Sequence, residues 1–330
     1  MRLFGLYILL MTFPFFVCAQ VASVAAPATD TLSMPGMKIM ANIRYGQADP
    51  KQNFDLYLPD HLAENTSDHD AGRTPSHVTT ASKRTRRGAG IPLMIWIHGG
   101  GWRMGVKKEM EIAYLADHGY AIASIDYRFS RDSIFPAQVR DCNAAIRYLW
   151  KNAGRWGLDT ARFIIAGASA GGHLASLIGM SLNNHRQDFD PYPLADHPVS
   201  IKAVINFYGP ADFYAFHGDG PGYKVDSATS SVSLLLGGTS LNRPDRARYA
   251  SPTTYVDSGD PPVLILHGDK DPIIPLYLDE LFYHVLQQAG VKSELMILPG
   301  AGHGGPAFSG DSSRQKVLSF LDEIFNTSNK

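Results

Sequence analysis

Short apolar runs alternate with helix-like segments from residue 93 to the C-terminus, and this alternation constrains the fold more than any other feature. Such short, uncharged runs are typical of parallel strands that are buried on both faces of a sheet. The candidate strands lie at residues 93–97, 121–125, 163–166, 203–207, 263–266 and 295–298. The helix-like segments lie at residues 108–118, 136–151, 171–182, 275–289 and 312–325. We therefore expect an α/β fold with a doubly wound, mostly parallel sheet.

The remaining segments suggest how the domain is organised. Residues 54–58 alternate apolar and polar side chains and predict an early antiparallel strand. Residues 64–90 are polar and predict an inserted surface loop, whereas residues 209–260, rich in Gly, Ser, Asp and Pro, predict a small cap-like excursion over the sheet. Because 45% of the 330 residues are hydrophobic, one large core can form, and we assign residues 41–330 to a single domain.

The charge balance excludes some classes of partner. The chain has 30 basic and 31 acidic residues, which gives a formal net charge of −1. No global field would attract nucleic acid or an anionic membrane. The basic run at residues 83–87 has no aromatic residues interleaved, so it predicts a solvated loop rather than a nucleic-acid patch. The composition favours a small or neutral ligand.

The sequence Gly167-Ala168-Ser169-Ala170-Gly171 follows an apolar strand and precedes a helix-forming stretch. Small residues on both sides of a serine allow the tight strand-to-helix turn that lifts a nucleophilic hydroxyl above a sheet. A G-x-S-x-G match alone could be a glycine-rich turn. Its position between a strand and a helix favours Ser169 as a nucleophile.

A glycine loop, His98-Gly99-Gly100-Gly101-Trp102, directly follows another predicted buried strand. Successive glycines leave backbone N–H groups open to a substrate oxygen that gains negative charge. Together with the serine turn, the loop predicts an oxyanion hole formed by the N–H groups of Gly100, Gly101 and Ala170. His98 is expected to brace the loop rather than act as a base.

A nucleophilic serine needs a histidine base and a carboxylate that orients the histidine, and in this type of fold they follow in the chain order Ser, Asp, His. Asp271 lies in the loop after the strand at 263–266, and His303 lies in a glycine-rich loop after the strand at 295–298. The competing Asp269 is expected to cap a turn. His173, in the helix after the serine, is expected to be packed in the core.

These motifs resemble the hormone-sensitive-lipase-like α/β-hydrolases, in particular their bacterial feruloyl and acetyl-xylan esterase branch (BD-FAE-like). The resemblance extends from Phe54 to the C-terminus and also includes Asp126-Tyr127-Arg128, Phe135-Pro136-Ala137 with Asp141, Ala250-Ser251-Pro252, HGDKD and GAGHG. It implies an α/β-hydrolase fold, a Ser169–His303–Asp271 triad and an Arg128–Asp141 pair. The segments 64–90 and 183–200 depart from the family pattern.

The resemblance implies a serine esterase that acts on a small ester or an acylated carbohydrate without a metal or organic cofactor. Short or aromatic acyl groups are expected, because the excursion at 209–260 contains too few apolar residues for a large lipase lid. Trp102, next to the glycine loop, is the candidate substrate-binding aromatic residue. One alternative is an amide-cleaving relative, such as a peptidase or an aryl formamidase, because the triad does not separate ester from amide hydrolysis. A non-catalytic binding module with the hydrolase fold is a second alternative.

The N-terminus resembles a secretory signal peptide. Arg2 precedes an apolar run at residues 3–17, and small residues suit cleavage after Ala19. We expect a signal peptide at 1–19, a spacer with little fixed structure at 20–40, and a secreted or periplasmic mature protein without a membrane anchor. A membrane-spanning anchor fits less well because the run is short and contains Pro14. Lipid attachment at Cys18 also fits less well, because bulky residues precede it.

Overall fold

The computed structural model describes residues 31–34, 36–60, 90–182, 188–190 and 199–327. The predicted signal peptide at 1–19, residues 64–89 of the predicted inserted loop and much of the segment 183–200 lie outside these residues. Within the described residues, no helix is both long enough and apolar enough to cross a membrane.

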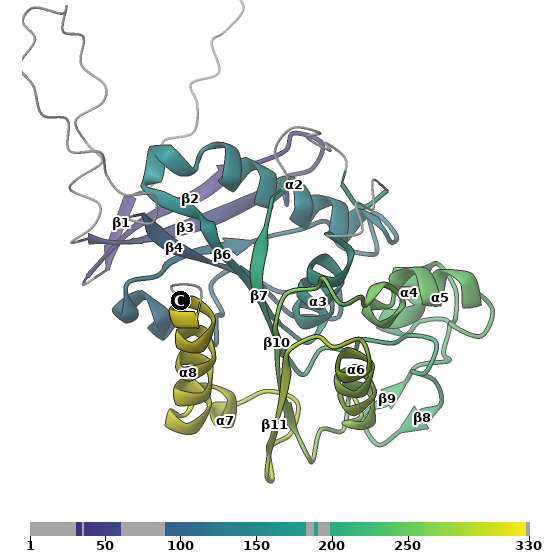
Figure 1. Cartoon of the computed structure of the whole chain (residues 1–330). Coiled ribbons are helices and arrows are strands. Elements are labelled where there is room, and N and C mark those ends of the chain that lie inside the picture. The colour runs from purple at the N-terminus through teal and green to yellow at the C-terminus, as the bar shows by residue number, and fades with distance from the viewer. Residues whose placement is uncertain (1–30, 35, 61–89, 183–187, 191–198, 328–330) are drawn as a thin grey trace, which may run out of the picture.

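The described residues form a nine-stranded sheet at the centre of the molecule (Figure 1). Its strand order is β1-β2-β3-β5-β4-β6-β7-β10-β11. The strands are β1 (Thr31–Met34), β2 (Met37–Arg44), β3 (Asn53–Pro59), β4 (Ile91–Ile97), β5 (Ala121–Ile125), β6 (Leu158–Ala168), β7 (Ile201–Phe207), β10 (Val263–Gly268) and β11 (Ser293–Leu298). The six predicted apolar runs all lie in strands of this sheet, and these six strands pair in parallel.

The first three strands are antiparallel to their neighbours, as expected for residues 54–58 in β3. In the parallel part, successive side chains enter different cores. Leu93, Ile95 and Ile97 of β4 belong to one buried cluster, whereas Met94 and Trp96 belong to the other. Successive side chains of a strand point to opposite faces of the sheet, and both faces are buried in these strands. Such a strand therefore needs apolar residues at successive positions.

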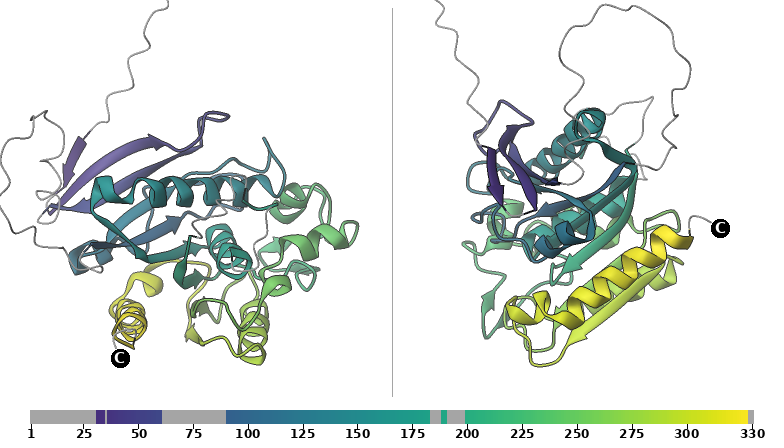
Figure 2. Two further views of the ribbon diagram at one scale, coloured as in Figure 1. Left: turned by 45° about the horizontal axis from the view of Figure 1, so that its top comes forward. Right: turned by 90° about the vertical axis from the view of Figure 1, so that its left-hand side faces the viewer.

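Helices cover both faces of the sheet. The helices and helical turns are η2 (Ala113–His118), α2 (Ala137–Lys151), η3 (Ala153–Trp156), α3 (Ala170–Leu182), α4 (Ser231–Leu236), α5 (Pro244–Ala250), η4 (Pro252–Tyr255), α6 (Tyr277–Gln288), α7 (Pro306–Ser309) and α8 (Asp311–Thr327). Apolar residues of α2, α3 and α6 join one core, and those of η2 and α8 join the other. Figures 1 and 2 show α6 and α8 on opposite sides of β10 and β11.

Two predictions about local structure are wrong. Residues 20–40 are not all a spacer, because β1 pairs with the first half of β2 and extends the edge of the sheet. This pairing is made by backbone hydrogen bonds, so the amino-acid composition of the segment does not predict it. The predicted helix at 108–118 is reduced to the 3-10 turn η2 at its end. The carbonyl groups of Lys107 and Glu109 accept hydrogen bonds from Ser124 Oγ and Trp96 Nε1, so tertiary contacts satisfy them in place of helical N–H groups.

The excursion at 209–260 contains a short two-stranded ribbon, β8 (Asp219–Gly220) with β9 (Tyr223–Lys224), followed by α4, α5 and η4. Phe213, Phe216 and Leu235 of this segment are buried. It is therefore a packed layer, and it borders the carboxyl ends of the parallel strands, where ligands bind in open α/β sheets.

Candidate active site

A sharp turn between β6 and α3 presents Ser169. Ser169 has φ of 54°, in the left-handed region that non-glycine residues rarely adopt. A Cβ at Gly171 would collide with the carbonyl oxygen of Ile97 in β4, so only glycine allows α3 to begin this close to the sheet. The local sequence therefore folds into the predicted strand-to-helix elbow.

The structure brings the three predicted triad residues together from three separate loops. The hydroxyl of Ser169 donates a hydrogen bond to Nε2 of His303 at 2.9 Å. Nδ1–H of His303 donates to Oδ2 of Asp271 at 2.7 Å. The Asp271 side chain is fully buried, and that of His303 is 16% exposed. This geometry is suited to proton transfer from the serine hydroxyl to the imidazole.

Asp271 is held as an acceptor. The backbone N–H groups of Ile273 and Ile274 donate to its Oδ1 at 2.8 and 2.9 Å. Burial by itself would raise the pKa of Asp271, but the hydrogen bond from His303 and the positive charge that His303 carries when protonated, together with these N–H groups, outweigh burial and lower the pKa. An ionised Asp271 keeps the proton of neutral His303 on Nδ1 and leaves Nε2 free to accept a proton.

Asp269 has a different role. Its Oδ1 accepts a hydrogen bond from the N–H of Gly300 at 2.6 Å. The contact joins the loop after β10 to the start of the loop that carries His303. The Asp269 side chain thus links two loops instead of capping a turn of its own, and its backbone N–H donates to the carbonyl oxygen of Leu298.

The glycine loop lies against the serine elbow. A Cβ at Gly99 would lie 2.9 Å from the carbonyl oxygen of Ala168 and 3.4 Å from Cβ of Ser169. Gly100 and Gly101 have φ of 104° and 58°, which favour glycine. The loop and Ala170, the first residue of α3, therefore meet beside Ser169. That their N–H groups hold an oxyanion stays a prediction.

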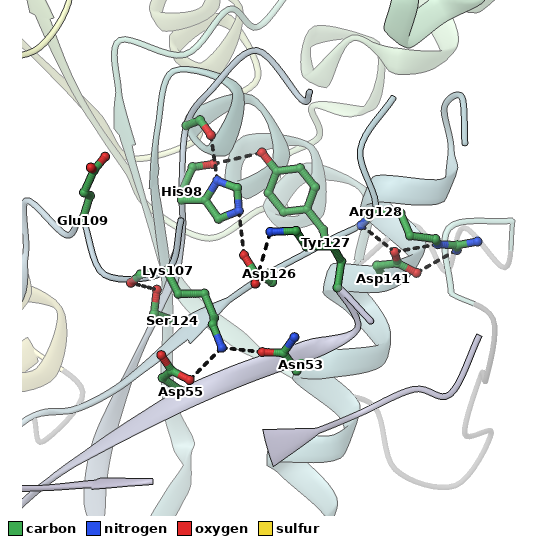
Figure 3. Close-up of polar contacts among 12 residues, drawn as sticks. Asn53, Asp55, His98, Lys107, Glu109, Ser124, Asp126, Tyr127, Arg128 and Asp141 are labelled. Carbon is green, nitrogen blue, oxygen red and sulfur yellow. Dashed lines mark hydrogen bonds and ion pairs between the residues drawn. The ribbon is translucent and has the colours of Figure 1, made fainter. Parts of the chain in front are cut away.

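His98 braces the start of the glycine loop. Its ring is stacked on Tyr127 with a centroid distance of 4.6 Å, and its Nε2 lies 3.2 Å from Oδ1 of Asp126 (Figure 3). The hydroxyl of Tyr127 donates to the carbonyl oxygen of His98 at 3.0 Å. These contacts attach the loop to the segment after β5 and give His98 the bracing role that we expected.

A buried ion pair holds the segment that follows the glycine loop, and sequence reasoning missed it. Nζ of Lys107 donates to Oδ1 of Asp55 in β3 at 2.7 Å and also to Asn53 (Figure 3). Lys107 is 7% exposed and Asp55 is 5% exposed. A signal was present, since Asp55 is a charged residue within an apolar strand and charged residues are rarely buried without a partner.

Trp102 is packed more deeply than a substrate platform would require. Its ring is 3% exposed and lies edge-on to His173 and Phe213, with centroid distances of 5.2 and 5.4 Å. It still borders the cavity beside Ser169. Direct contact of Trp102 with substrate therefore stays a prediction. His173 is fully buried, as expected.

A cavity of about 770 Å³ opens beside the triad. Its walls come from the glycine loop, the elbow, residues 222–232 of the excursion, Ile273 with Ile274, and His303. Two acidic residues, Glu109 and Glu111, also line it. The volume is in the range of pockets that bind small molecules.

A second buried polar group lies behind the triad. Nδ1 of His267 lies 2.6 Å from Oδ2 of Asp279, and its Nε2–H donates to the carbonyl oxygen of Ile274 at 2.9 Å. Nε2 of His267 also lies 3.5 Å from Oδ2 of Asp271. Sequence reasoning assigned no role to His267, which here supports the loop that carries Asp271.

The sheet order, the elbow and the Ser169–His303–Asp271 array define an α/β-hydrolase. Residues 81–286, more than half of the chain, match the family BD-FAE. The chain belongs to the BD-FAE family.

Relatives and structural neighbours include several esterases. Esterase LipC of Mycobacterium tuberculosis (strain ATCC 25618 / H37Rv) is 31% identical over 245 residues, which cover 71% of this chain and 58% of LipC. The chain thus spans little more than half the length of LipC and of two further curated relatives that it matches.

Two solved structures are also similar. A truncated form of a carbohydrate esterase from gut microbiota has a TM-score of 0.70 and 28% identity, covering 91% of this chain and 99% of that chain. A bifunctional GH43-CE from Bacteroides eggerthii has a TM-score of 0.70 and 27% identity, covering 86% of this chain and 35% of that chain.

Proposed function

We propose that this protein is a serine-dependent carboxylic ester hydrolase. The observation that carries the proposal is the continuous hydrogen-bonded array from Ser169 through His303 to Asp271 at the edge of a cavity. Membership of the BD-FAE family and the esterase relatives support it.

In the proposed reaction, Nε2 of His303 takes the hydroxyl proton as Ser169 Oγ attacks the ester carbonyl carbon. The N–H groups of Gly100, Gly101 and Ala170 stabilise the oxyanion. The carbon–oxygen bond to the alcohol then breaks, and the alcohol leaves with the proton from His303. Water, deprotonated by the same imidazole, attacks the acyl-enzyme and releases the acid, and the proton returns to Ser169.

Short acyl groups, and feruloyl or acetyl groups on plant polysaccharides, are the proposed substrates. The names of the carbohydrate-esterase neighbours support the polysaccharide part of this proposal. The packed excursion at 209–260 supports the short acyl part, because apolar residues such as Phe213 and Leu235 lie in the core and only isolated ones, such as Tyr214 and Leu241, are exposed. Export across the membrane belongs to the proposal and rests on the sequence of residues 1–19.

The proposal is tested with Ser169→Ala and a matched surface variant, Ser319→Ala. Ser319 is exposed and far along the chain in α8. Hydrolysis of p-nitrophenyl acetate should fall by about 10⁴-fold or more in Ser169→Ala and stay near wild type in Ser319→Ala. A fluorophosphonate probe should label wild type and Ser319→Ala but not Ser169→Ala. Retained activity in a folded Ser169→Ala protein would reject the serine mechanism.

A further inference from the structure

Glu111 and Tyr208 form a polar pair in the wall of the catalytic cavity. The hydroxyl of Tyr208 donates a hydrogen bond to Oε1 of Glu111 at 2.7 Å. Both residues line the same cavity as Ser169 and His303. Glu111 is half-buried, whereas Tyr208 is 4% exposed.

Tyr208 ties this pair to the proposed base. Its ring lies edge-on to the His303 ring at a centroid distance of 4.8 Å and contacts Phe308 at 4.5 Å. Its φ is 43°, a conformation that costs energy in a non-glycine residue and that the surrounding contacts maintain. A Cβ at Gly304, the residue after His303, would lie 3.1 Å from the Tyr208 hydroxyl oxygen. The position of Glu111 relative to His303 is therefore fixed.

The side of the cavity next to His303 is the side of the leaving alcohol. His303 must reach the alcohol oxygen with Nε2 to protonate it, whereas the carbonyl oxygen must point toward the glycine loop. Groups packed on the imidazole therefore border the alcohol half of the ester. Tyr208 is such a group, and its hydroxyl holds the Glu111 carboxylate next to it.

A carboxylate at this position is a strong acceptor of hydrogen bonds from hydroxyl groups. An ionised carboxylate has about four acceptor sites, and Tyr208 uses one of them. Hydrogen bonds to a charged acceptor are stronger than those between neutral groups. Burial raises the pKa of Glu111 above its usual value, and the hydrogen bond from the Tyr208 hydroxyl offsets only part of this rise, as is expected of a poorly solvated carboxylate that gains from a further donor.

We propose that Glu111, held by Tyr208, is a leaving-group subsite that accepts hydrogen bonds from hydroxyl groups of the alcohol, so that esters of polyhydroxylated alcohols such as saccharides are preferred over simple alkyl esters. This inference rests on the proposed esterase function. The acyl half of the substrate does not contact the subsite.

The experiment keeps the acyl group constant and varies the alcohol. The substrates are ethyl acetate, glycerol monoacetate and a mono-O-acetylated methyl xyloside, and kcat/KM is measured for wild type and for Glu111→Ala, Glu111→Gln and Tyr208→Phe. In Glu111→Ala, kcat/KM for the xyloside should fall about 10-fold or more beyond any fall for ethyl acetate, since a hydrogen bond to a charged group is lost. Glycerol monoacetate should show a smaller selective loss.

The other variants separate the subsite from general effects. Glu111→Gln preserves size and an acceptor oxygen, so its selective loss should be smaller than that of Glu111→Ala. Tyr208→Phe keeps the ring on His303 but removes the hydroxyl, and it should show the same selectivity change in weaker form. Glu109→Ala removes an exposed carboxylate of the same cavity and controls for charge alone.

Two kinds of failure are distinguishable. If wild type hydrolyses all three esters but folded Glu111→Gln and Glu111→Ala lower all three rates equally, or if Glu109→Ala gives the same selective loss, the subsite is overturned and the esterase function stands. If wild type hydrolyses none of them and no probe labels Ser169, the esterase function itself fails.

Discussion

Nε1–H of Trp102 donates a hydrogen bond to Nδ1 of His173 at 3.1 Å, so the glycine loop is attached to the helix that follows the nucleophile. The other ring nitrogen, Nε2–H of His173, donates to the carbonyl oxygen of Ala250 at 2.7 Å. His173 must therefore be neutral, with its proton on Nε2. One buried imidazole thus joins the loop, α3 and the excursion.

This arrangement predicts acid sensitivity of the fold. Burial lowers the pKa of His173 from 6.5 to about 4, although the bond to Ala250 opposes the change. Between these values the unfolded chain binds a proton that the folded chain does not, so stability decreases as pH falls from 6.5 to about 4, by at most on the order of 3 kcal/mol. Urea unfolding at several pH values should show this loss for wild type.

His173→Gln is the matched variant for that measurement, because an amide side chain does not titrate. The free energy of unfolding of His173→Gln should depend less steeply on pH between 4 and 6.5 than that of wild type. Equal slopes would show that the pH dependence arises from other groups.

The two aspartates of the loop after β10 should differ strongly in their effect on catalysis. Asp271→Asn should lower kcat by about 10⁴-fold, because an amide does not hold the Nδ1–H tautomer of His303. Asp269→Asn should have a small effect, since the Asp269 side chain accepts a hydrogen bond from the Gly300 N–H, which an amide oxygen can also accept, and no hydrogen bond joins it to His303. Steady-state kinetics on p-nitrophenyl acetate checks both variants, and the reverse order of effects would contradict the triad.

Arg128 and Asp141 form the pair that the family resemblance implied. Nε and Nη2 of Arg128 donate to the two carboxylate oxygens at 2.8 and 2.7 Å, and Asp141 is 1% exposed. Arg128→Met should lower the free energy of unfolding by about 3 kcal/mol, because it leaves a buried carboxylate without its counter-charge. Arg131→Met, which breaks an exposed pair with Asp132, should cost less than about 1 kcal/mol in the same denaturation experiment.

Lys107 should position the glycine loop. In Lys107→Met the segment that follows the glycine loop loses its attachment to β3 and no longer holds the loop in place, so kcat should fall by more than KM rises, because oxyanion stabilisation acts mainly in the transition state. Lys108→Met, at the exposed neighbouring residue, is the control.

If Lys107→Met does not fold, Lys107→Met combined with Asp55→Leu removes both charges of the pair and should restore the fold. A folded variant with unchanged kcat would contradict the positioning role.

The sequence alone determined the features that local chemistry imposes. The elbow around Ser169 needs small residues next to a serine, and the loop at Gly100 and Gly101 needs residues that adopt positive φ, so both appear as short motifs. Strands buried on both faces need uncharged runs, and these were located correctly. The chain order Ser169, Asp271, His303 followed from the resemblance and from the loops after strands.

Only the tertiary structure decided the contacts between distant residues. Tyr208 and Glu111 are 97 residues apart, and Lys107 meets Asp55 across 52 residues. The spacing of residues along the sequence does not predict contacts between such distant residues. The same reason explains the wrong helix prediction at 108–118. There, backbone carbonyl groups accept hydrogen bonds from the side chains of Trp96 and Ser124 in neighbouring strands instead of from helical N–H groups. Buried backbone N–H and C=O groups need hydrogen-bond partners, and the partners available to them depend on which strands and loops lie nearby in the folded protein.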